Sequence, residues 1–303
     1  MIHAPVMVRE VVAVLVTRAD GRYVDGTVGD GGHAQAILDA TQSSSQLLGL
    51  DRDPEALRAA GEALATYGER VHLVQSDFAN LADVLPQLGW ERVDGILLDL
   101  GLRSSALDDA QRGFSFQLDG PLDMRFDPWE GTPARELLRR INPSRLEQLL
   151  AAGTTRASPR AIARAILAWR RQERLERTSD LVACLRRGLG RRATPKLLSS
   201  VFAAVRMEVN RELAGLDRAL ATMPEILGTG GILCVLSYQS QEDRRIKQLR
   251  RTPFRDPRTG ERFRLIPLEK RPQQALPEEV RRNRRARSAR LRAFQRVPET
   301  PAS

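Results

Sequence analysis

Apolar positions in the first hundred residues fall into two alternating patterns. Four short apolar runs, each followed or closed by a polar residue, are typical of strands buried on both faces of a parallel sheet. These runs lie at 23–25, 47–51, 71–77 and 93–99. Between them apolar residues recur at helical spacing, as at Leu57, Ala60 and Leu64. The alternation predicts an α/β fold with polar groups at the carboxyl edge of its sheet.

The pattern changes after residue 99. The stretch 112–127 is rich in Gly, Pro and Asp, yet it carries three Phe, so we expect an irregular loop rather than a helix or strand. Because it directly follows the strand that ends at Asp99, we expect this loop to face the substrate. A loop packed by its own aromatic side chains is the alternative.

Helices dominate the chain beyond this loop. Four dipeptides pair a capping residue with proline, a combination that starts helices. They are Thr132-Pro133, Asn142-Pro143, Ser158-Pro159 and Thr194-Pro195. An apolar stripe from Leu197 to Leu220 then predicts one long helix that returns the chain to the sheet, where 232–238 adds a buried strand. The expected domains are 1–107 (sheet domain, first part), 108–206 (all-helical insertion for substrate recognition) and 207–303 (sheet domain, second part, with a basic C-terminal segment).

Three shorter elements are expected near the ends of the chain. Apolar residues at 11–16 predict the buried face of a first helix. Ser240, with Asp243 three residues later, predicts the start of another. At 289–293 apolar residues alternate with Arg, which predicts a strand with one apolar and one basic face.

A cluster of glycines joins the first strand to its helix. Gly29, Gly31 and Gly32 let the backbone turn sharply and approach a ligand where a Cβ would collide. Asp51 closes the next strand, at the place where a βαβ nucleotide site keeps the carboxylate that accepts from ribose hydroxyls. Many glycine clusters are simple turns. Strand, turn, helix and acid in this order nevertheless predict nucleotide binding.

The class of nucleotide depends on the strands that follow. The spacing Gly29-x-Gly31-x-x-Ala34 also satisfies the dinucleotide fingerprint, so a nicotinamide enzyme is an alternative to an S-adenosylmethionine enzyme. Phe78, preceded by an acid, suits stacking on an adenine. Asp99 ends the next strand and brings a carboxylate to the sheet edge. These two residues favour a methyltransferase.

Composition agrees with a folded intracellular enzyme of 303 residues, of which 42% are hydrophobic and 28% charged. Cys184 and Cys234 are far apart in the chain, so we expect no disulfide, and neither has partners at metal-ligand spacing. The early apolar run is too short for a signal sequence. We therefore expect a cytoplasmic protein without a metal.

The net charge of +10 is concentrated near the C-terminus. Residues 244–296 contain 17 Arg and 2 Lys against 5 acids, a balance of +14, so the rest of the chain carries −4. Such a segment suits a polyanion such as nucleic acid. A solvated surface in an Arg-rich composition is the other interpretation.

A set of motifs spread over almost the whole chain resembles the bacterial 16S ribosomal RNA cytosine-N4 methyltransferases. They are Tyr23-Val24-Asp25 with Gly31-Gly32-His33, Asp51-Arg52-Asp53-Pro54, Asp94-Gly95-Ile96-Leu97, Arg112-Gly113-Phe114-Ser115-Phe116, Asp119-Gly120-Pro121-Leu122-Asp123-Met124-Arg125, Val209-Asn210-x-Glu212-Leu213, Glu242-Asp243-Arg244 and Asn283-x-Arg285-Ala286-Arg287-Ser288-Ala289-x-Leu291-Arg292. The resemblance implies a class I methyltransferase fold, S-adenosylmethionine as donor and the P-site cytosine of 16S ribosomal RNA as acceptor. It implies the RNA or a small-subunit particle as partner and no membrane, and it leaves a homodimer open.

The same resemblance assigns donor contacts residue by residue. They are Gly31, Gly32 and His33 at the turn, Asp51 at the ribose, Phe78 near the adenine and Asp99 near the methionine end. A glutamine of the family has no counterpart, because Ala106 stands in its place. Further departures on the acceptor side fall at Arg103, Lys196 to Ser200, Gln239 and Gln241. An RNA-binding ribosome assembly factor with a vestigial donor site is therefore kept as the alternative function.

Asp99 is also the candidate catalytic residue. A cytosine amine is a poor nucleophile because its lone pair is delocalised, so transfer needs in-line placement and an acceptor that polarises the N–H. The sheet edge would place Asp99 beside the transferred methyl. Its other possible role is to hold only the amino group of the donor.

Overall fold

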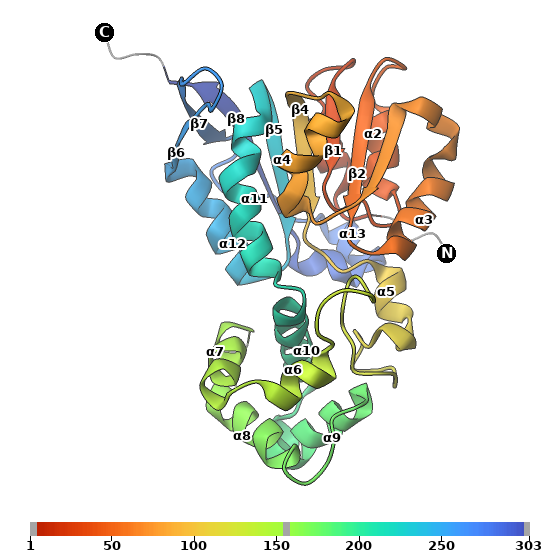
Figure 1. The fold of residues 1–303 in the computed structure, drawn as a ribbon, viewed down its shortest axis with the longest axis vertical. Helices are drawn as coiled ribbons and strands as arrows, with labels where there is room; N and C mark the ends of the chain where they lie inside the picture. The colour runs from red at the N-terminus through yellow and green to blue at the C-terminus, as the bar shows by residue number, and fades with distance from the viewer. Residues whose placement is uncertain (1–4, 154–157, 300–303) are drawn as a thin grey trace. The chain divides into compact units, whose positions relative to one another are not determined.

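The computed structural model describes residues 5–153 and 158–299, and the chain divides into two compact units (Figure 1). The first unit combines 1–101 with 214–303, and the second is 102–213, where the sequence analysis placed the insertion at 108–206. Each unit has its own hydrophobic core. No helix in the described ranges has the length and apolar character needed to cross a membrane.

An eight-stranded sheet forms the centre of the first unit (Figure 1). Its strands are β1 (Arg22–Asp25), β2 (Gln46–Asp51), β3 (Val71–Gln75), β4 (Val93–Asp99), β5 (Leu227–Ser237), β6 (Pro253–Arg255), β7 (Arg262–Pro267) and β8 (Arg290–Pro298). The spatial order is β3-β2-β1-β4-β5-β8-β7-β6. The first five strands pair in parallel, which confirms the predicted α/β sheet, and β8, β7 and β6 continue it antiparallel.

Helices cover both faces of this sheet. They are α1 (Val8–Leu15), α2 (Gly32–Asp39), α3 (Pro54–Leu64), α4 (Leu81–Val84), α11 (Glu212–Ile226), α12 (Ser240–Ile246) and α13 (Pro277–Arg282). Successive strand residues point to opposite faces. Leu47 and Leu97 accordingly join the core lined by α1, α2 and α3, whereas Leu48 and Leu98 join the core lined by α4, α11 and α12. Burial on both sides explains why these strands are almost continuously apolar.

The second unit is helical, as predicted. Its helices are α5 (Ser104–Asp108), α6 (Ala134–Arg140), α7 (Pro143–Gly153), α8 (Pro159–Trp169), α9 (Thr178–Leu189) and α10 (Pro195–Val209). Three predicted caps are confirmed, because the side chains of Asn142, Ser158 and Thr194 each accept from a backbone N–H three residues ahead.

The cap predicted at Thr132 is wrong. Pro133 itself occupies the N-cap position of α6, in an extended conformation and without a side-chain hydrogen bond. The first free amides of the helix are satisfied by the preceding loop instead. The N–H of Ala134 donates to the carbonyl of Asp123 at 2.6 Å, and that of Arg135 donates to Leu122 at 2.8 Å.

The glycine- and proline-rich loop 112–127 packs into the core of its own unit. Phe114 is buried and lies 5.9 Å from Phe126, ring centre to ring centre, while Phe116 makes an edge contact with Phe202. These contacts agree with the alternative interpretation, in which the aromatic side chains of the loop serve to pack it. Phe116 and Phe126 are only half-buried, and that the loop also faces the substrate stays a prediction.

The long helix predicted from Leu197 to Leu220 is broken. Helix α10 ends at Val209 and α11 begins at Glu212, with Arg211 in the left-handed region at φ 50°. Asn210 causes the break through its side chain, which accepts from the N–H of Phe126 at 2.8 Å and donates to the carbonyl of Met124 at 2.7 Å.

Two details near the C-terminus also differ from expectation. Helix α12 is capped one residue earlier than predicted, because the buried carboxylate of Glu242 accepts from the N–H groups of Tyr238 and Gln239 at 2.9 Å each. Asp243 is left to pair with Arg290 and Arg292 of β8. The predicted strand is confirmed, but part of its basic face is neutralised by this acid.

Each unit contains one free cysteine. Cys234 lies in β5 of the first unit and Cys184 in α9 of the second, and both are buried. Burial raises the pKa of Cys184 to about 12. Burial likewise raises the pKa of Cys234, with a further contribution from the Asp99 carboxylate.

Candidate active site

The turn between β1 and α2 has the backbone shape that its glycines predict. Gly29 and Gly31 have positive φ values of 54° and 89°, which L side chains rarely adopt. A Cβ on Gly32 would lie 2.8 Å from Cγ of Pro5, so this position also has no room for a side chain. The first N–H groups of α2 therefore lie behind a narrow, bare backbone turn, a geometry suited to a closely approaching ligand.

Asp51 lies beside this turn at the end of β2. Its Oδ2 accepts from the N–H of Gly29 at 3.0 Å, and its Oδ1 accepts from the N–H of Asp53 at 2.9 Å. Asp53 in turn caps α3 by accepting from the N–H of Glu55. The predicted acid and the predicted turn are thus brought together by hydrogen bonds.

Phe78 begins a short 3-10 turn, Phe78–Asn80, just after β3. Asp77 caps that turn by accepting from the N–H of Ala79 at 2.9 Å. A Cβ on Gly26 would lie 3.1 Å from Cβ of Phe78, which places the half-buried Phe78 next to the end of β1. The aromatic group therefore lies on the same edge of the sheet as Asp51.

Asp99 ends β4 and is held from several directions. Its N–H donates to Oγ1 of Thr27 at 2.7 Å, and its Oδ1 accepts weakly from the N–H of Gly101 at 3.3 Å. Its Oδ2 lies 3.8 Å from Nδ1 of His33. Its side chain remains 20% exposed, which leaves the carboxylate accessible at the sheet edge.

His33, in the first turn of α2, is buried and has a fixed orientation. Its Nε2 lies 2.9 Å from the carbonyl oxygen of Val6. Since a carbonyl can only accept, Nε2 carries a proton, and Nδ1 is the nitrogen directed at Asp99. The N-terminal segment thus sets the direction in which this imidazole faces the site.

Sequence reasoning missed two residues at the same edge. Asp25 is 1% exposed, and its Oδ2 has no hydrogen-bond partner within the described residues, although Oδ1 accepts from the N–H of Thr27. Burial raises the pKa of Asp25 to about 6, against the lowering influence of His33. Asp25 ends its strand as Asp51 and Asp99 do, and this shared position was the signal that could have identified it.

Tyr238 is the second missed residue. It follows β5 directly, next to the strand that carries Asp99. Burial raises the pKa of Tyr238, and the nearby Asp99 carboxylate raises it further, so the hydroxyl keeps its proton. The signal that could have identified Tyr238 is its position directly after a parallel strand, where the other site residues also lie.

The residues present fit S-adenosylmethionine. The ring of Pro5 leaves no room for a Cβ at Gly32, and the buried Oδ2 of Asp25 has an acceptor position that the described protein groups leave unused. Asp51 supplies a carboxylate next to the glycine turn, and Phe78 supplies an aromatic face. Together these groups match a ligand with a cationic amino acid part, a ribose and a purine. Ala106 belongs to the second unit, and its buried methyl group offers no hydrogen bond.

A parallel sheet of this order, with acids as the last residues of β1, β2 and β4 and a glycine turn before α2, defines a class I S-adenosylmethionine-dependent methyltransferase. Residues 1–297 match the model of the MraW methylase family. The chain belongs to this family, which confirms the resemblance seen in the sequence motifs.

Curated relatives extend this match over nearly the full length. A protein of Solidesulfovibrio magneticus named ribosomal RNA small subunit methyltransferase H is 41% identical over 99% of this chain and 97% of its own. A protein of the same name from Thermomicrobium roseum is 41% identical over 97% of this chain and 94% of its own. The crystal structure of an rRNA methylase from Streptococcus thermophilus covers 98% of this chain and 99% of its own, at 11% identity and with a TM-score of 0.43.

Proposed function

We propose that this protein transfers a methyl group from S-adenosylmethionine to N4 of the P-site cytosine in 16S ribosomal RNA. The observation that carries the proposal is family membership along residues 1–297, with relatives at 41% identity that are named for methylating small-subunit ribosomal RNA. The choice of cytosine and of N4 follows from the motif resemblance. Action on ribosomal RNA implies work in the cytoplasm.

The groups at the sheet edge have distinct proposed roles toward the donor. The turn at Gly31 and Gly32 gives close backbone approach, and Asp51 accepts from the ribose hydroxyls. Phe78 offers its ring to the adenine. Asp25 supplies a buried carboxylate for the amino group, because its Oδ2 is the orphaned acceptor of the site.

Asp99 is proposed to act on the acceptor amine. Bound S-adenosylmethionine supplies an electrophilic methyl group on sulfur. As the new N–C bond forms, the bond from that methyl group to sulfur breaks and its electron pair stays on the sulfur. N4 must lose one proton, which the partly exposed carboxylate of Asp99 can accept and release to water. His33 Nδ1 lies 3.8 Å from that carboxylate, and the backbone N–H of Gly101 donates to its other oxygen at 3.3 Å.

The second unit is proposed to recognise the acceptor RNA. A base must leave its stack to reach a methyl group at the sheet edge, and aromatic rings can stabilise an unstacked base. Trp129 is 87% exposed, while its backbone is held by a hydrogen bond from its N–H to the buried Asp127 at 2.8 Å. An exposed ring on a held loop is suited to stacking.

The direct test is nucleoside mass spectrometry of 16S RNA from a strain that lacks the gene. We expect N4-methylcytosine to disappear and to return when the wild-type gene is supplied. Modification that persists unchanged in the deletion strain would contradict the proposal, provided that no second copy of the gene is present.

The alternative is an RNA-binding assembly factor with a vestigial donor site. It is favoured by one observation, the replacement of a family glutamine by Ala106. Single-turnover assays with small-subunit particles separate the two functions. Binding of donor and RNA without any methylcytosine, on any assembly intermediate, would support the assembly factor.

A further inference from the structure

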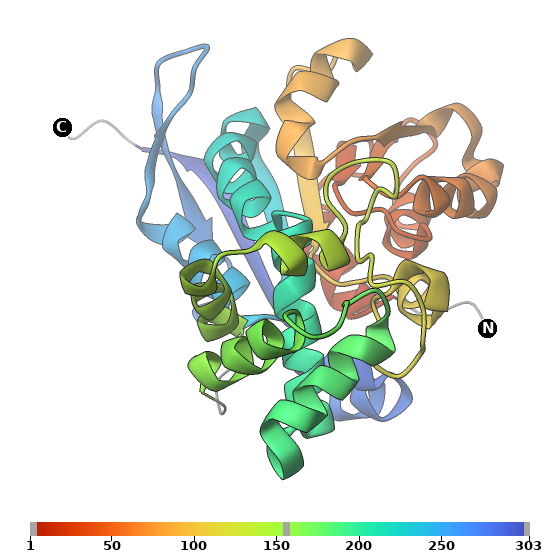
Figure 2. The ribbon, with the colours of Figure 1, turned by 60° about the horizontal axis from the view of Figure 1, so that its bottom comes forward.

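Strands β6 and β7 form a hairpin at one edge of the eight-stranded sheet, and it projects from the first unit as the long blue loop at the upper left of Figure 2. The stretch 247–264, which contains this hairpin, has seven basic residues and only two acids. One acid is Asp256, which is 3% exposed, and the other is the exposed Glu261. The outer surface of the hairpin is therefore strongly basic.

Three arginines share one face of this hairpin. Arg255 lies directly opposite Arg262, and Arg264 is two residues further along the same strand, so all three side chains point the same way. Phe254 and Phe263 point to the other face, where their rings stack at 5.4 Å. All three arginines are exposed.

The facing pair of arginines is an unusual choice for a hairpin. Like charges directly opposite each other destabilise a two-stranded pair. Within the described residues neither Arg255 nor Arg262 forms an ion pair, and Arg264 is paired only with Glu299. Stability of the hairpin therefore does not explain why two positive charges face each other there.

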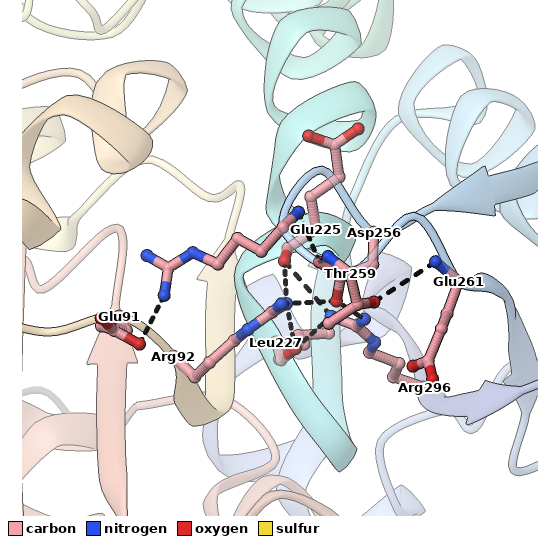
Figure 3. Close-up of polar contacts among 9 residues, drawn as sticks. Glu91, Arg92, Glu225, Leu227, Asp256, Thr259, Glu261 and Arg296 are labelled. Carbon is pink, nitrogen blue, oxygen red and sulfur yellow. Dashed lines mark hydrogen bonds and ion pairs between the residues drawn. The ribbon is translucent and has the colours of Figure 1, made fainter.

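Asp256 cannot neutralise this face, because it is directed inward (Figure 3). Its carboxylate binds the guanidinium groups of Arg92 and Arg296, and it also accepts from the N–H of Arg258 at 2.9 Å. The Arg296 guanidinium lies 3.9 Å from the ring centre of Phe263. This cluster anchors the hairpin turn to the sheet, and among the described residues it leaves Arg255 and Arg262 without a compensating acid.

We infer that the face formed by Arg255, Arg262 and Arg264 is an RNA-binding surface that contacts the phosphate backbone. The inference rests on the proposed action on ribosomal RNA and adds a contact surface to it. Guanidinium groups bind phosphate oxygens through paired hydrogen bonds, and RNA presents a continuous series of such oxygens. Contacts to the phosphate backbone carry no sequence information, so we expect this surface to bind RNA independently of sequence.

The hairpin lies well away from the donor site. Five strand spacings separate β1 from β6 in the sheet order, which amounts to about 24 Å. That distance corresponds to about seven base pairs along a nucleic acid duplex. The hairpin therefore contacts RNA that flanks the reacting base and contributes to binding rather than to methyl transfer.

The test is the double variant Arg255→Gln with Arg262→Gln, assayed for binding to purified 16S RNA and to polyuridylate across a range of salt concentrations. We expect affinity for both RNAs to fall about tenfold at low salt, and the slope of log affinity against log salt to decrease by about 1.4 to 1.8. S-adenosylmethionine affinity should stay unchanged. The free energy of unfolding should stay unchanged or rise, because the variant removes two like charges that face each other across the hairpin.

The matched control is Arg9→Gln with Arg58→Gln, which removes two exposed charges from α1 and α3 of the same unit. RNA affinity and salt slope equal to those of this control would overturn the inference. So would a hairpin variant that aggregates while binding RNA normally, since the arginines would then be protecting an edge strand. If either result is obtained and the wild-type protein still methylates 16S RNA, only the hairpin inference is overturned and the proposed function stands. Wild-type protein that neither binds nor methylates 16S RNA overturns the proposed function, and the hairpin inference with it.

Discussion

The carboxylate of Asp51 accepts a hydrogen bond from the backbone N–H of Gly29, 22 residues earlier in the chain, at 3.0 Å. This bond joins the end of β2 to the turn after β1. The acid proposed to bind the ribose therefore also holds the turn in position before the donor arrives. Loss of this carboxylate should affect both the ligand and the turn.

Asp51→Ala should weaken S-adenosylmethionine binding by about 1 to 3 kcal/mol, because ribose hydroxyls lose a charged acceptor. Calorimetry measures the change. Asp53→Ala is the matched control, since it removes the cap of α3 and should lower stability by about 1 kcal/mol with little effect on donor affinity. Equal losses of donor affinity in both variants would argue against a ribose contact at Asp51.

Asp25→Asn should make the ligand-free protein more stable at neutral pH. The folded-state pKa of about 6 exceeds the ordinary value of 3.8, so the stability linked to this proton is fully present below pH 3.8 and is lost as the pH rises to 6. About two pKa units correspond to about 3 kcal/mol at most. Urea unfolding should show the gain at pH 7.5 and almost none below pH 4.

The same variant should bind S-adenosylmethionine more weakly, because the neutral asparagine side chain would lack the charge for the amino group. Stability and binding should thus change in opposite directions. A variant that is less stable at pH 7.5 would show that the Asp25 carboxylate is not costly when buried.

Asp99→Asn should lower single-turnover methylation by about two orders of magnitude or more. Asn is nearly isosteric but cannot take the amine proton, so donor affinity should fall much less than the rate. Rapid-quench assays at saturating donor provide the measurement. Restoration of the rate by saturating donor would instead assign Asp99 to donor binding only.

Asp256→Ala should destabilise the protein by about 3 to 5 kcal/mol, because the buried Arg296 would lose its carboxylate partner, and the partly exposed Arg92 would lose the same partner. Burial alone would raise the pKa of Asp256, but the N–H of Arg258 and the two guanidinium groups lower it overall. The stabilisation is therefore present above about pH 4 and declines as the pH falls further.

Urea unfolding at pH 7 and at pH 3 tests this prediction. Glu261→Ala removes the exposed acid of the same turn and should change stability by less than about 0.5 kcal/mol. A small effect of Asp256→Ala at pH 7, similar to that control, would contradict the anchoring role.

Trp129→Ala should weaken RNA binding, whereas Trp129→Phe should retain most of it, because stacking needs only an aromatic face. A loss of about 1 to 3 kcal/mol is expected for Ala if a base stacks there. Wild-type tryptophan fluorescence should be quenched by RNA, and the quenching should vanish in both variants. Persistent quenching in Trp129→Phe would assign the signal to Trp90 or Trp169.

Features fixed by neighbouring residues could be predicted from the sequence. The caps at Asn142, Ser158 and Thr194 use partners three residues away, and the apolar strands specify a sheet buried on both faces. The glycine turn and the acid of β2 also belong to a contiguous βαβ unit. Local chemistry determined these elements, so local patterns were sufficient to find them.

Features fixed by distant residues could not be predicted. The break at Asn210 depends on hydrogen bonds to Met124 and Phe126, more than 80 residues earlier. The start of α6 at Ala134 depends on loop carbonyls rather than on Thr132. Asp25 was a different case, because its position after a strand was visible while its burial and unused oxygen required the three-dimensional structure.

The two buried thiols give the protein a built-in pair of unfolding reporters. Cys234 lies in the sheet unit and Cys184 in the helical unit, and burial keeps both in the unreactive protonated form. A thiol reagent should therefore modify each cysteine only when its own unit opens. Mass spectrometry of the labelled peptides would then follow the opening of the catalytic and helical units separately, in wild-type protein and without engineered probes.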